Sequence, residues 1–438
     1  MVSESFVNSL PEHWELTTLG EACKRGGGDI QTGPFGSQLH ASDYVPTGIP
    51  SIMPQNIGDN RIIIDGIARI TVEDAERLSR YRVREGDIVY SRRGDVERRA
   101  LIREEENGWL CGTGCLRVRF GSSAIDPLFA SYYLGHPEVR QWIVRHAVGA
   151  TMPNLNTSIL SALPFVIPSL DEQQAIAQVL GSLDEKIQLN RQIDETLEET
   201  ARAVFESWFV EYSPVRAFLG ESASEGIDED IAALFPDSFD DSEVGEVPKG
   251  WKVGKLQELI SERSERIGKT EDAVVFSAVQ TGNLIRSEEQ FNKKVFSNDI
   301  SKYKLVERTN YAYNPSRINI GSIGMLEEGV LGAVSPVYTV FKVKVGYEWW
   351  LRFFIRLPRT REIISQLCSG SVRQSLTFRD LASVPVVIPP PMVVEAFTQH
   401  YLLLRDVQIN LREQNQSLAA IRDTLLPKLM SGEISVKP

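Results

Sequence analysis

Two stretches of the chain, 221 residues apart, carry the same helical pattern. In residues 171–212 a heptad seam advances by alternating steps of four and three residues through Ile176, Leu180, Leu183, Ile187, Asn190, Asp194, Leu197, Ala201, Val204 and Trp208. Such a seam, kept up for about five heptads, is typical of a helix that packs along its length against another helix. At about 1.5 Å per residue this helix is expected to span on the order of 60 Å, more than one compact domain needs.

The partner helix is predicted to lie in the same chain. Adding 221 to each seam position gives Phe397, Tyr401, Leu404, Gln408, Leu411, Asn415, Leu418, Arg422, Leu425 and Leu429. The same offset relates Pro164 to Pro385 and Pro168 to Pro389, which precede the two helices. Two unrelated amphipathic helices would not share one offset across loop, strand and helix. The pattern therefore indicates an internal duplication.

Short strands and a helix precede each long helix, which predicts an α+β fold with two domains. Leu10-Pro11-Glu12-His13-Trp14 returns as Val247-Pro248-Lys249-Gly250-Trp251, at an offset of 237. One further helix is expected over residues 127–147 and another over residues 349–367. We expect a first domain at residues 1–168, a long helix at 169–212, an acidic linker at 213–246, a second domain at 247–390, and a second long helix with a tail at 391–438.

The charge is unevenly distributed along the chain. The net charge is −12, yet residues 220–246 contain no Lys or Arg, while residues 77–103 hold nine arginines and four acids. A negative total is therefore compatible with a local DNA-binding face. The four cysteines suit a reducing cytosol, and we interpret Cys111 and Cys115 as core residues. Without a signal-peptide pattern or an apolar run of membrane-spanning length, the chain is expected in the cytoplasm.

Five sequence strings stand out along the chain: GDIVYSRRGD at residues 86–95, GATMPNLN at 149–156, PSLDEQQ at 168–174, IAALFPDSF at 231–239 and LLPKLMSGEI at 425–434. Each string alone is a weak signal, but their order and the duplication strengthen it. Together they resemble the specificity subunit of Type I restriction–modification systems over essentially the whole chain.

The resemblance implies a division of labour. Members of the family have two target-recognition domains, each reading one half of a split sequence in double-stranded DNA. Two long antiparallel helices hold the domains apart and dock two methyltransferase (modification) subunits, which restriction subunits then join. The resemblance also implies that S-adenosylmethionine, ATP and magnesium belong to those partner subunits, and that this chain binds no cofactor.

The residues themselves predict no catalytic group. A base-modifying methyltransferase needs an Asp/Asn-Pro-Pro-aromatic loop and a glycine-rich cofactor turn. Asp126-Pro127-Leu128-Phe129 and Asn314-Pro315-Ser316-Arg317 lack the second proline, and we interpret both as turns. The five histidines follow no metal-binding pattern, so no metal site is predicted.

Candidate DNA-binding residues are the loop Gly36, Ser37 and Gln38, the strand end Arg92 and Arg93, and the re-entry loop Thr151, Asn154 and Asn156. Arginine can read a guanine edge and asparagine an adenine edge, whereas a glycine-bearing loop suits a phosphate. The alternative for Arg92 and Arg93 is a solvated strand end balanced by Asp87, Asp95 and Glu97. In the second half the candidates are Lys293, Lys294, Arg317 and Arg373.

Helix pairing or subunit docking is assigned to the apolar positions Ile176, Leu183, Ile187, Leu197, Trp208, Leu404, Leu411, Leu418 and Leu425, and to Asn190. Polar seam positions such as Asn190, Gln408 and Arg422 either set the register of the pair or face partner subunits. Pro427 is expected to break or kink the second helix.

Two other functions remain possible from the sequence. The first is the target-reading subunit of a system in which modification and cleavage share one chain. The second is a purely structural coiled-coil scaffold, which would show no salt-dependent DNA binding.

Overall fold

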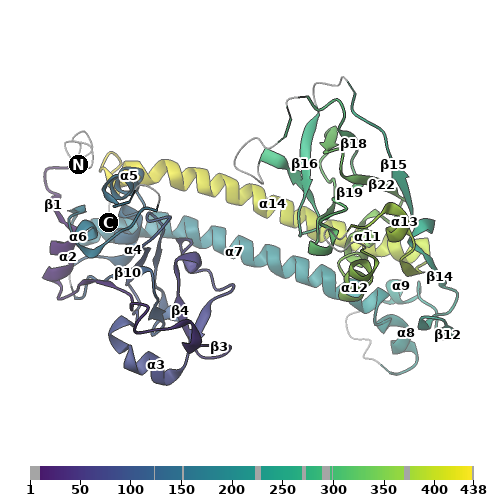
Figure 1. The fold of residues 1–438 in the computed structure, drawn as a ribbon, viewed down its shortest axis with the longest axis horizontal. Helices are drawn as coiled ribbons and strands as arrows, with labels where there is room; N and C mark the ends of the chain where they lie inside the picture. The colour runs from purple at the N-terminus through teal and green to yellow at the C-terminus, as the bar shows by residue number, and fades with distance from the viewer. Residues whose placement is uncertain are drawn as a thin grey trace. The chain divides into compact units, whose positions relative to one another are not determined.

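The computed structural model describes residues 10–122, 124–149, 152–221, 228–268, 273–288, 296–297, 299–368 and 375–436. They form two compact units, Met1–Gln192 with Leu411–Pro438, and Ile193–Asn410. Each unit combines one mixed α+β domain with a stretch of both long helices (Figure 1), so the predicted fold class is confirmed. Within these ranges, every helix is too short or too polar to serve as a membrane span.

The domain of the first unit is built on two β-sheets. Its strands are β2 (Ile30–Thr32), β3 (Tyr44–Val45), β4 (Ile49–Ile52), β5 (Asp59–Asn60), β6 (Ala68–Ile70), β7 (Ile88–Ser91), β8 (Arg99–Leu101), β9 (Leu110–Cys111) and β10 (Cys115–Val118). The sheets have the orders β2-β10-β7-β8-β5 and β3-β6-β4-β9. Cys111 and Cys115 are buried free thiols in this core, where burial raises the pKa of Cys111 to about 12.

Short helices cover these sheets and lead into the long helix. They are α2 (Leu19–Arg25), α3 (Val72–Arg77), α4 (Pro127–Tyr133), α5 (Pro137–His146) and α6 (Thr157–Ser161). The single helix expected over residues 127–147 is therefore wrong. His136 has an extended ψ of 137°, and Pro137, which has no N–H to give to the preceding turn, starts a new helix.

The second unit repeats this plan with different sheets. Its strands include β14 (Lys252–Lys255), β15 (Ile260–Arg263), β16 (Val274–Ala278), β17 (Leu284–Arg286), β18 (Lys304–Val306), β19 (Tyr311–Tyr313), β20 (Ile323–Met325), β21 (Gly332–Val334), β22 (Thr339–Val343) and β23 (Pro385–Ile388). The sheet orders are β15-β22-β19-β20 and β17-β16-β21-β18. Its helices α11 (Glu348–Phe354), α12 (Pro358–Leu367) and α13 (Phe378–Ala382) complete the domain, and Pro358 again divides a stretch expected as one helix.

The duplication is visible in the element boundaries. In the first unit β1 (Glu15–Thr18) pairs antiparallel with β11 (Pro164–Ile167), and in the second β14 pairs in the same way with β23. Helices α4, α5 and α6 start 221 residues before α11, α12 and α13. We call the residues up to the end of the first long helix the first repeat, and residues 247–430 the second repeat.

The two long helices each contain 40 residues, α7 (Leu170–Phe209) and α14 (Pro391–Met430). In the first unit Asp184 of α7 contacts Arg422 of α14, and Asn190 contacts Asn415. As the residue number rises along α7, the residue number of its contact in α14 falls, so the two helices are antiparallel. The break expected at Pro427 is wrong, because α14 continues to Met430. The helix tolerates the loss of the one N–H that residue 427 would have donated to the carbonyl of residue 423.

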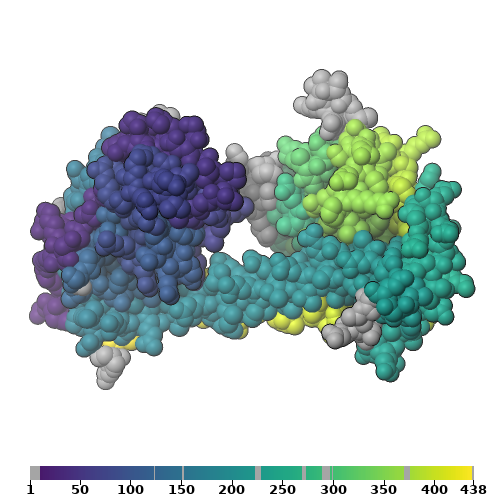
Figure 2. All heavy atoms as spheres, turned by 90° about the horizontal axis from the view of Figure 1, so that it is seen from below, coloured from purple at the N-terminus to yellow at the C-terminus, as the bar shows by residue number. Residues whose placement is uncertain are grey.

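The acidic segment after α7 contains regular structure. It forms α8 (Ser213–Phe218), α9 (Glu229–Ala232) and a hairpin of β12 (Phe239–Ser242) with β13 (Gly245–Pro248). Figure 2 shows these atoms, in green-teal, gathered around the C-terminal end of α7 in the second unit. Phe235, Phe239 and Trp251 pack there against Trp208, Phe209 and Tyr212.

Candidate nucleic-acid interface

In the first unit three loops meet beside the C-terminal end of β7. The backbone N–H of Arg92 donates to Gly114 O at 2.8 Å, and Arg92 O accepts from Leu155 N at 2.9 Å. Arg93 forms an isolated β-bridge with Asn154, and Gly94 N donates to Pro153 O at 3.2 Å. The predicted strand end and the predicted re-entry loop are thus brought together by main-chain hydrogen bonds.

A cation and an aromatic ring lie side by side at this junction. The guanidinium carbon of Arg92 is 5.8 Å from the ring centroid of Phe35, and 54% of Phe35 is exposed. This distance allows a cation–π attraction that holds the arginine in place. Arg92 Nε is buried and has no hydrogen-bond partner among the described residues. Phe35 was missed in the sequence, although an aromatic residue in a glycine-bearing loop is a usable signal.

The acids that could have neutralised Arg92 and Arg93 are engaged elsewhere. Asp87 pairs with Arg119 at 2.5 Å, Asp95 with Arg98 at 3.0 Å, and Glu97 with Arg140 at 2.6 Å. The balanced strand end considered above is therefore not what the described residues form. Arg93 is exposed, and its positive charge is available to a phosphate or a base edge.

Most other arginines of residues 77–103 stabilise the domain itself. Arg77 pairs with Asp74 at 2.5 Å, Arg82 Nε donates to Gly108 O at 2.8 Å, and Arg103 donates to Asn60 O at 3.2 Å. Arg99 is 5% exposed and donates to Ser131 O at 2.7 Å. The density of arginine in the sequence therefore overstates the positive charge that faces solvent.

The remaining first-unit candidates differ in exposure and in whether their side chains already make hydrogen bonds. Gly36 and Ser37 are exposed, and nothing lies within 4 Å of the position that a Cβ on Gly36 would take. Gln38 is held by Tyr81, whose hydroxyl donates to Gln38 Oε1 at 2.9 Å. Asn156 caps α6 by accepting from Ile159 N at 2.8 Å, which occupies the side chain locally. Thr151 lies outside the described residues.

The second unit has a corresponding turn after β19. Leu376 N donates to Pro315 O at 3.1 Å, which reproduces the bond from Leu155, 221 residues earlier, to Arg92. The turn is closed by Arg317 N donating to Asn314 O at 3.0 Å, and the Arg317 side chain is exposed. Arg317 therefore follows the second central strand as Arg93 follows the first. Lys293, Lys294 and Arg373 lie outside the described residues.

Of the two motifs compared with a methyltransferase loop, Asn314-Pro315-Ser316-Arg317 is a turn as expected, whereas Asp126-Pro127-Leu128-Phe129 caps and begins helix α4. Asp126 is the N-cap of α4, where its Oδ1 accepts from Phe129 N at 2.7 Å, and Pro127 occupies the first turn. Asn314 Oδ1 accepts from Ser316 N at 3.1 Å within its own loop. Both side chains are engaged in shaping the backbone.

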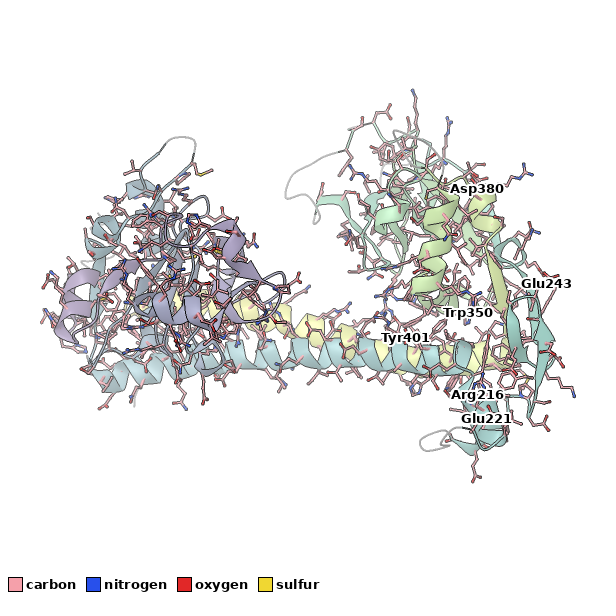
Figure 3. All side chains as sticks on the ribbon, turned by 60° about the horizontal axis from the view of Figure 1, so that its bottom comes forward. Arg216, Glu221, Glu243, Trp350, Asp380 and Tyr401 are labelled. Carbon is pink, nitrogen blue, oxygen red and sulfur yellow. The ribbon has the colours of Figure 1, made fainter. Side chains whose placement is uncertain are left out.

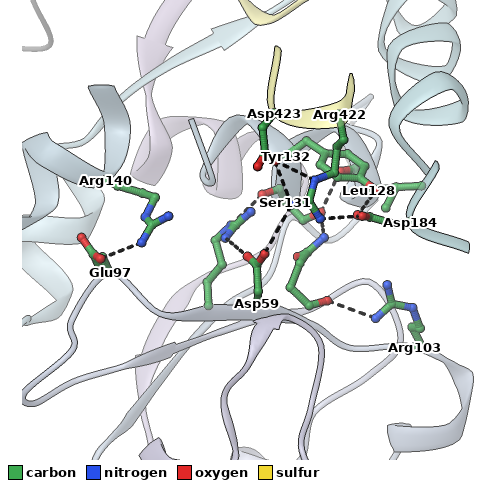
Figure 4. A network of polar contacts seen from close by, with 12 residues as sticks. Asp59, Glu97, Arg103, Leu128, Ser131, Tyr132, Arg140, Asp184, Arg422 and Asp423 are labelled. Carbon is green, nitrogen blue, oxygen red and sulfur yellow. Dashed lines mark hydrogen bonds and ion pairs between the residues drawn. The ribbon is translucent and has the colours of Figure 1, made fainter. Parts of the chain in front are cut away.

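A polar network attaches the first domain to both long helices (Figure 4). Asp184 of α7 accepts from Tyr132 of α4 at 2.7 Å and from Arg422 of α14 at 2.8 Å. Arg422 also pairs with Asp423, and Asn60 donates to Ser131 at 3.1 Å. Because the side chain of Asp184 is 16% exposed and that of Arg422 is 20% exposed, this pair is shielded from solvent more than a surface ion pair.

The polar seam positions contact the paired helix. Asn190 is fully buried, and its Nδ2 donates to Gln414 Oε1 at 2.6 Å and to Asn415 Oδ1 at 2.9 Å. In the second unit Gln408 Nε2 donates to Asp194 O at 3.0 Å. These contacts fit the register-setting interpretation of Asn190, Gln408 and Arg422.

Three of the apolar seam positions of α7 assigned to helix pairing are buried, near both ends and in the middle of the helix. Ile176, Ile187 and Trp208 are at most 6% exposed. Leu183, Leu197, Leu404, Leu411, Leu418 and Leu425 are half-buried. The seam of the two helices is therefore not buried uniformly along its length.

Comparison with known proteins identifies the kind of domain that these loops belong to. Residues 11–199 match the family model described as the Type I restriction modification DNA specificity domain. This part of the chain is therefore similar to a Type I DNA specificity domain. The match covers the domain of the first unit, with the loops around Phe35, Arg92 and Asn154, and most of α7.

Curated relatives align over nearly the full chain. The specificity subunit of the Type I restriction enzyme HindI from Haemophilus influenzae is 22% identical, with 88% of this chain and 95% of the relative covered. The MjaIX specificity subunit from Methanocaldococcus jannaschii is 23% identical, with 99% and 96% covered. The predicted resemblance to Type I specificity subunits is confirmed.

A solved structure shares the fold. The crystal structure of a Type I restriction–modification S subunit from M. genitalium aligns with a TM-score of 0.56 at 15% sequence identity. The alignment covers 96% of each chain. The same combination of domains and long helices is therefore found in a solved S subunit.

Proposed function

We propose that this chain is the non-catalytic DNA sequence-specificity subunit of a Type I restriction–modification complex. The observation that carries the proposal is a segment similar to a Type I DNA specificity domain, whose secondary structure recurs at a fixed offset in the same chain. Two such domains suit a target in two parts, with one domain for each half. The alternatives, a fused modification and cleavage system or a purely structural scaffold, are not favoured by relatives named as Type I specificity subunits.

The face around Phe35, Arg92, Arg93 and Asn154 is the proposed contact with the first half-site. Its support is that Arg93 is exposed and that the nearby acids are paired with other arginines. Gly36 and Ser37 would approach the sugar–phosphate backbone, and the arginines a phosphate or a guanine edge. Arg317 is the proposed counterpart for the second half-site, together with Lys293, Lys294 and Arg373.

The paired helices are proposed to set the spacing of the half-sites and to dock two methyltransferase subunits, which restriction subunits then join. S-adenosylmethionine, ATP and magnesium would act in those partners, in the cytoplasm. Among the described residues no group of His, Cys, Asp or Glu could hold a metal ion. Deleting or adding one heptad in both α7 and α14 is expected to change the permitted gap while both half-sites stay readable.

Co-expression with the neighbouring methyltransferase, followed by mapping of methylated adenines across the host genome, tests the function. A recurrent two-part motif is the expected result. Random or absent methylation would instead favour the scaffold. The fused alternative is tested in the same cells, because modification and nuclease activities would then co-purify on one partner chain.

Which loops read which half is tested in the same assay with matched variants. An Arg92→Gln and Arg93→Gln double variant should relax or abolish one half of the motif, and Arg317→Gln should affect only the other half. Arg98→Gln is the control, since Arg98 is in the same turn but pairs with Asp95. If both variants weaken the same half, the assignment of one domain to each half is wrong.

A further inference from the structure

The second unit contains an apolar cavity that the proposed function does not use. Its volume is about 520 Å³, and it is partly open to solvent. Aromatic side chains form much of its wall, namely Phe205 and Phe209 of α7, Tyr212, and Trp350 and Phe354 of α11. A cavity of roughly 300–1,000 Å³ with an apolar lining and few polar groups is typical of small-molecule sites.

One wall carries a hydrogen-bond donor without a partner. Trp350 is 1% exposed, and its Nε1 has no hydrogen-bond partner among the described residues. In Figure 3 Trp350 lies where the domain of the second unit meets the long helices, and Arg216 lies on the segment that follows α7. The Nε1 atom itself is buried, so Trp350 contributes its ring, and not an accessible hydrogen-bond donor, to the cavity wall.

The rim of the cavity is positively charged. Arg216 is neutralised by Glu221 at 3.0 Å and Glu246 at 3.6 Å, whereas Arg359 is exposed and has no ion pair among the described residues. Helix α12 begins at this rim, and its N-cap, Leu357, has no side-chain acceptor for the first-turn N–H groups. The free N–H groups and the Arg359 guanidinium would both attract an anionic group.

The first repeat shows the same site filled. Subtracting 221 from Phe354, Ile363 and Val386 gives Tyr133, Trp142 and Phe165, which are larger and are all buried in the first core. The counterpart of Leu357 is His136, whose Nδ1 accepts from Glu138 N at 3.2 Å. The counterpart of Arg359 is Glu138 itself. Smaller wall residues, an uncapped helix and a cation therefore occur together in the second repeat.

We propose that this cavity binds a small planar aromatic anion. Its ring system would lie among Phe205, Phe209, Trp350 and Phe354. Its anionic group would lie at the rim, near Arg359 and the N-terminus of α12. This site is separate from the proposed DNA contacts, so the proposal does not depend on sequence recognition.

The test uses the full chain and the dye 1-anilinonaphthalene-8-sulfonate, an aromatic anion that fluoresces when it binds in an apolar site. Saturable binding with one dye per chain is expected. The uncharged analogue N-phenyl-1-naphthylamine, which lacks only the sulfonate, should bind at least tenfold more weakly. Arg359→Glu should weaken the sulfonate dye about tenfold and leave the neutral dye unchanged, and Arg379→Glu, an exposed charge outside the cavity, should change neither.

Filling the cavity decides whether the dye binds there. Ile363→Trp with Val386→Phe introduces the residues of the first repeat and should abolish binding without lowering Tm. If that variant does not fold, Val386→Phe alone should weaken binding about fivefold. Unchanged binding in these variants, or equal affinity for the two dyes, would overturn the proposal.

Discussion

Each repeat attaches its domain to a long helix through an equivalent helix position, and the charge at that position is opposite in the two repeats. In the first unit Asp184 of α7 accepts from Tyr132 and Arg422. Adding 221 gives Arg405 of α14, which pairs in the second unit with Glu327 and lies 5.1 Å from the ring centroid of Trp349. The duplicated backbone has been kept while its charge has been reversed. Each domain is therefore matched to its own stretch of helix.

The apolar contacts differ in the same way. Where the first unit packs Ile176 and Leu180 of α7 into its core, the second unit packs Phe397 and Tyr401 of α14. Phe397 lies 5.4 Å, between ring centroids, from each of Phe205, Phe209 and Phe353. At these equivalent helix positions aliphatic side chains in the first unit and aromatic ones in the second thus support one architecture, and the comparison can be tested by substitutions there.

The largest effect is expected at the aromatic helix positions. Phe397→Ala should lower the free energy of unfolding by about 4 kcal/mol, and the equivalent Ile176→Ala by about 3 kcal/mol, because both side chains are almost fully buried. Urea denaturation measures the loss, and hydrogen exchange locates it. If Phe397→Ala loosens the first unit as much as the second, the two cores are not independent.

A smaller effect is expected at the charge-reversed position. Asp184→Ala leaves Arg422 and Tyr132 without their shared acceptor and should cost about 2 kcal/mol. Asp423→Ala is the control, since that carboxylate also contacts Arg422 but its side chain is 65% exposed, so the cost should stay below about 0.5 kcal/mol. Equal costs would mean that the network in Figure 4 does not hold the domain.

The helix caps of α5 and α12 predict different responses to acid. Burial lowers the pKa of His136 to about 4 from 6.5, so its contribution to stability is complete above pH 6.5 and is lost as pH falls toward 4. Between pH 7 and pH 5 this loss amounts to about 2 kcal/mol. His136→Leu, which copies Leu357, should remove that part of the pH dependence in denaturation curves, and His40→Leu, at an exposed ring, should leave it unchanged.

The smallest effect is expected at the proposed DNA face. Arg93→Gln should weaken DNA binding by the assembled complex by about 1 kcal/mol and lower the slope of log affinity against log salt by about 1. Arg98→Gln, in the same turn, should do neither because of its pairing with Asp95. A salt slope unaffected by Arg93→Gln would place the phosphate contacts on another face.

The sequence was most informative where the repeat constrains the backbone. One offset and one heptad pattern predicted two paired helices, and Pro137 and Pro358 could have indicated the helix breaks that were missed. Pro427 misled because a helix can continue through a proline when the rest of its hydrogen bonds and its packing are kept. The three proline effects are local in the chain, whereas the offset relates segments 221 residues apart.

The polar contacts could not be predicted, because they join segments far apart in sequence. Asp184 meets Tyr132, 52 residues away, and Arg422, 238 residues away, and neither distance follows a local pattern. The availability of Arg93 depended on whether Asp87, Asp95 and Glu97 were already paired, which only the folded domain reveals. Phe35 became a candidate only once the guanidinium of Arg92 was found beside it.

The first core is closed by side chains from the far end of the polypeptide. Leu429 and Met430 are buried among the residues of the first domain. A ribosome that has released only the first two hundred or so residues has therefore not yet made two of the side chains that line that core. The first domain therefore cannot complete its core until translation is nearly over. Until then the apolar side chains that Leu429 and Met430 cover stay exposed to chaperones or to aggregation.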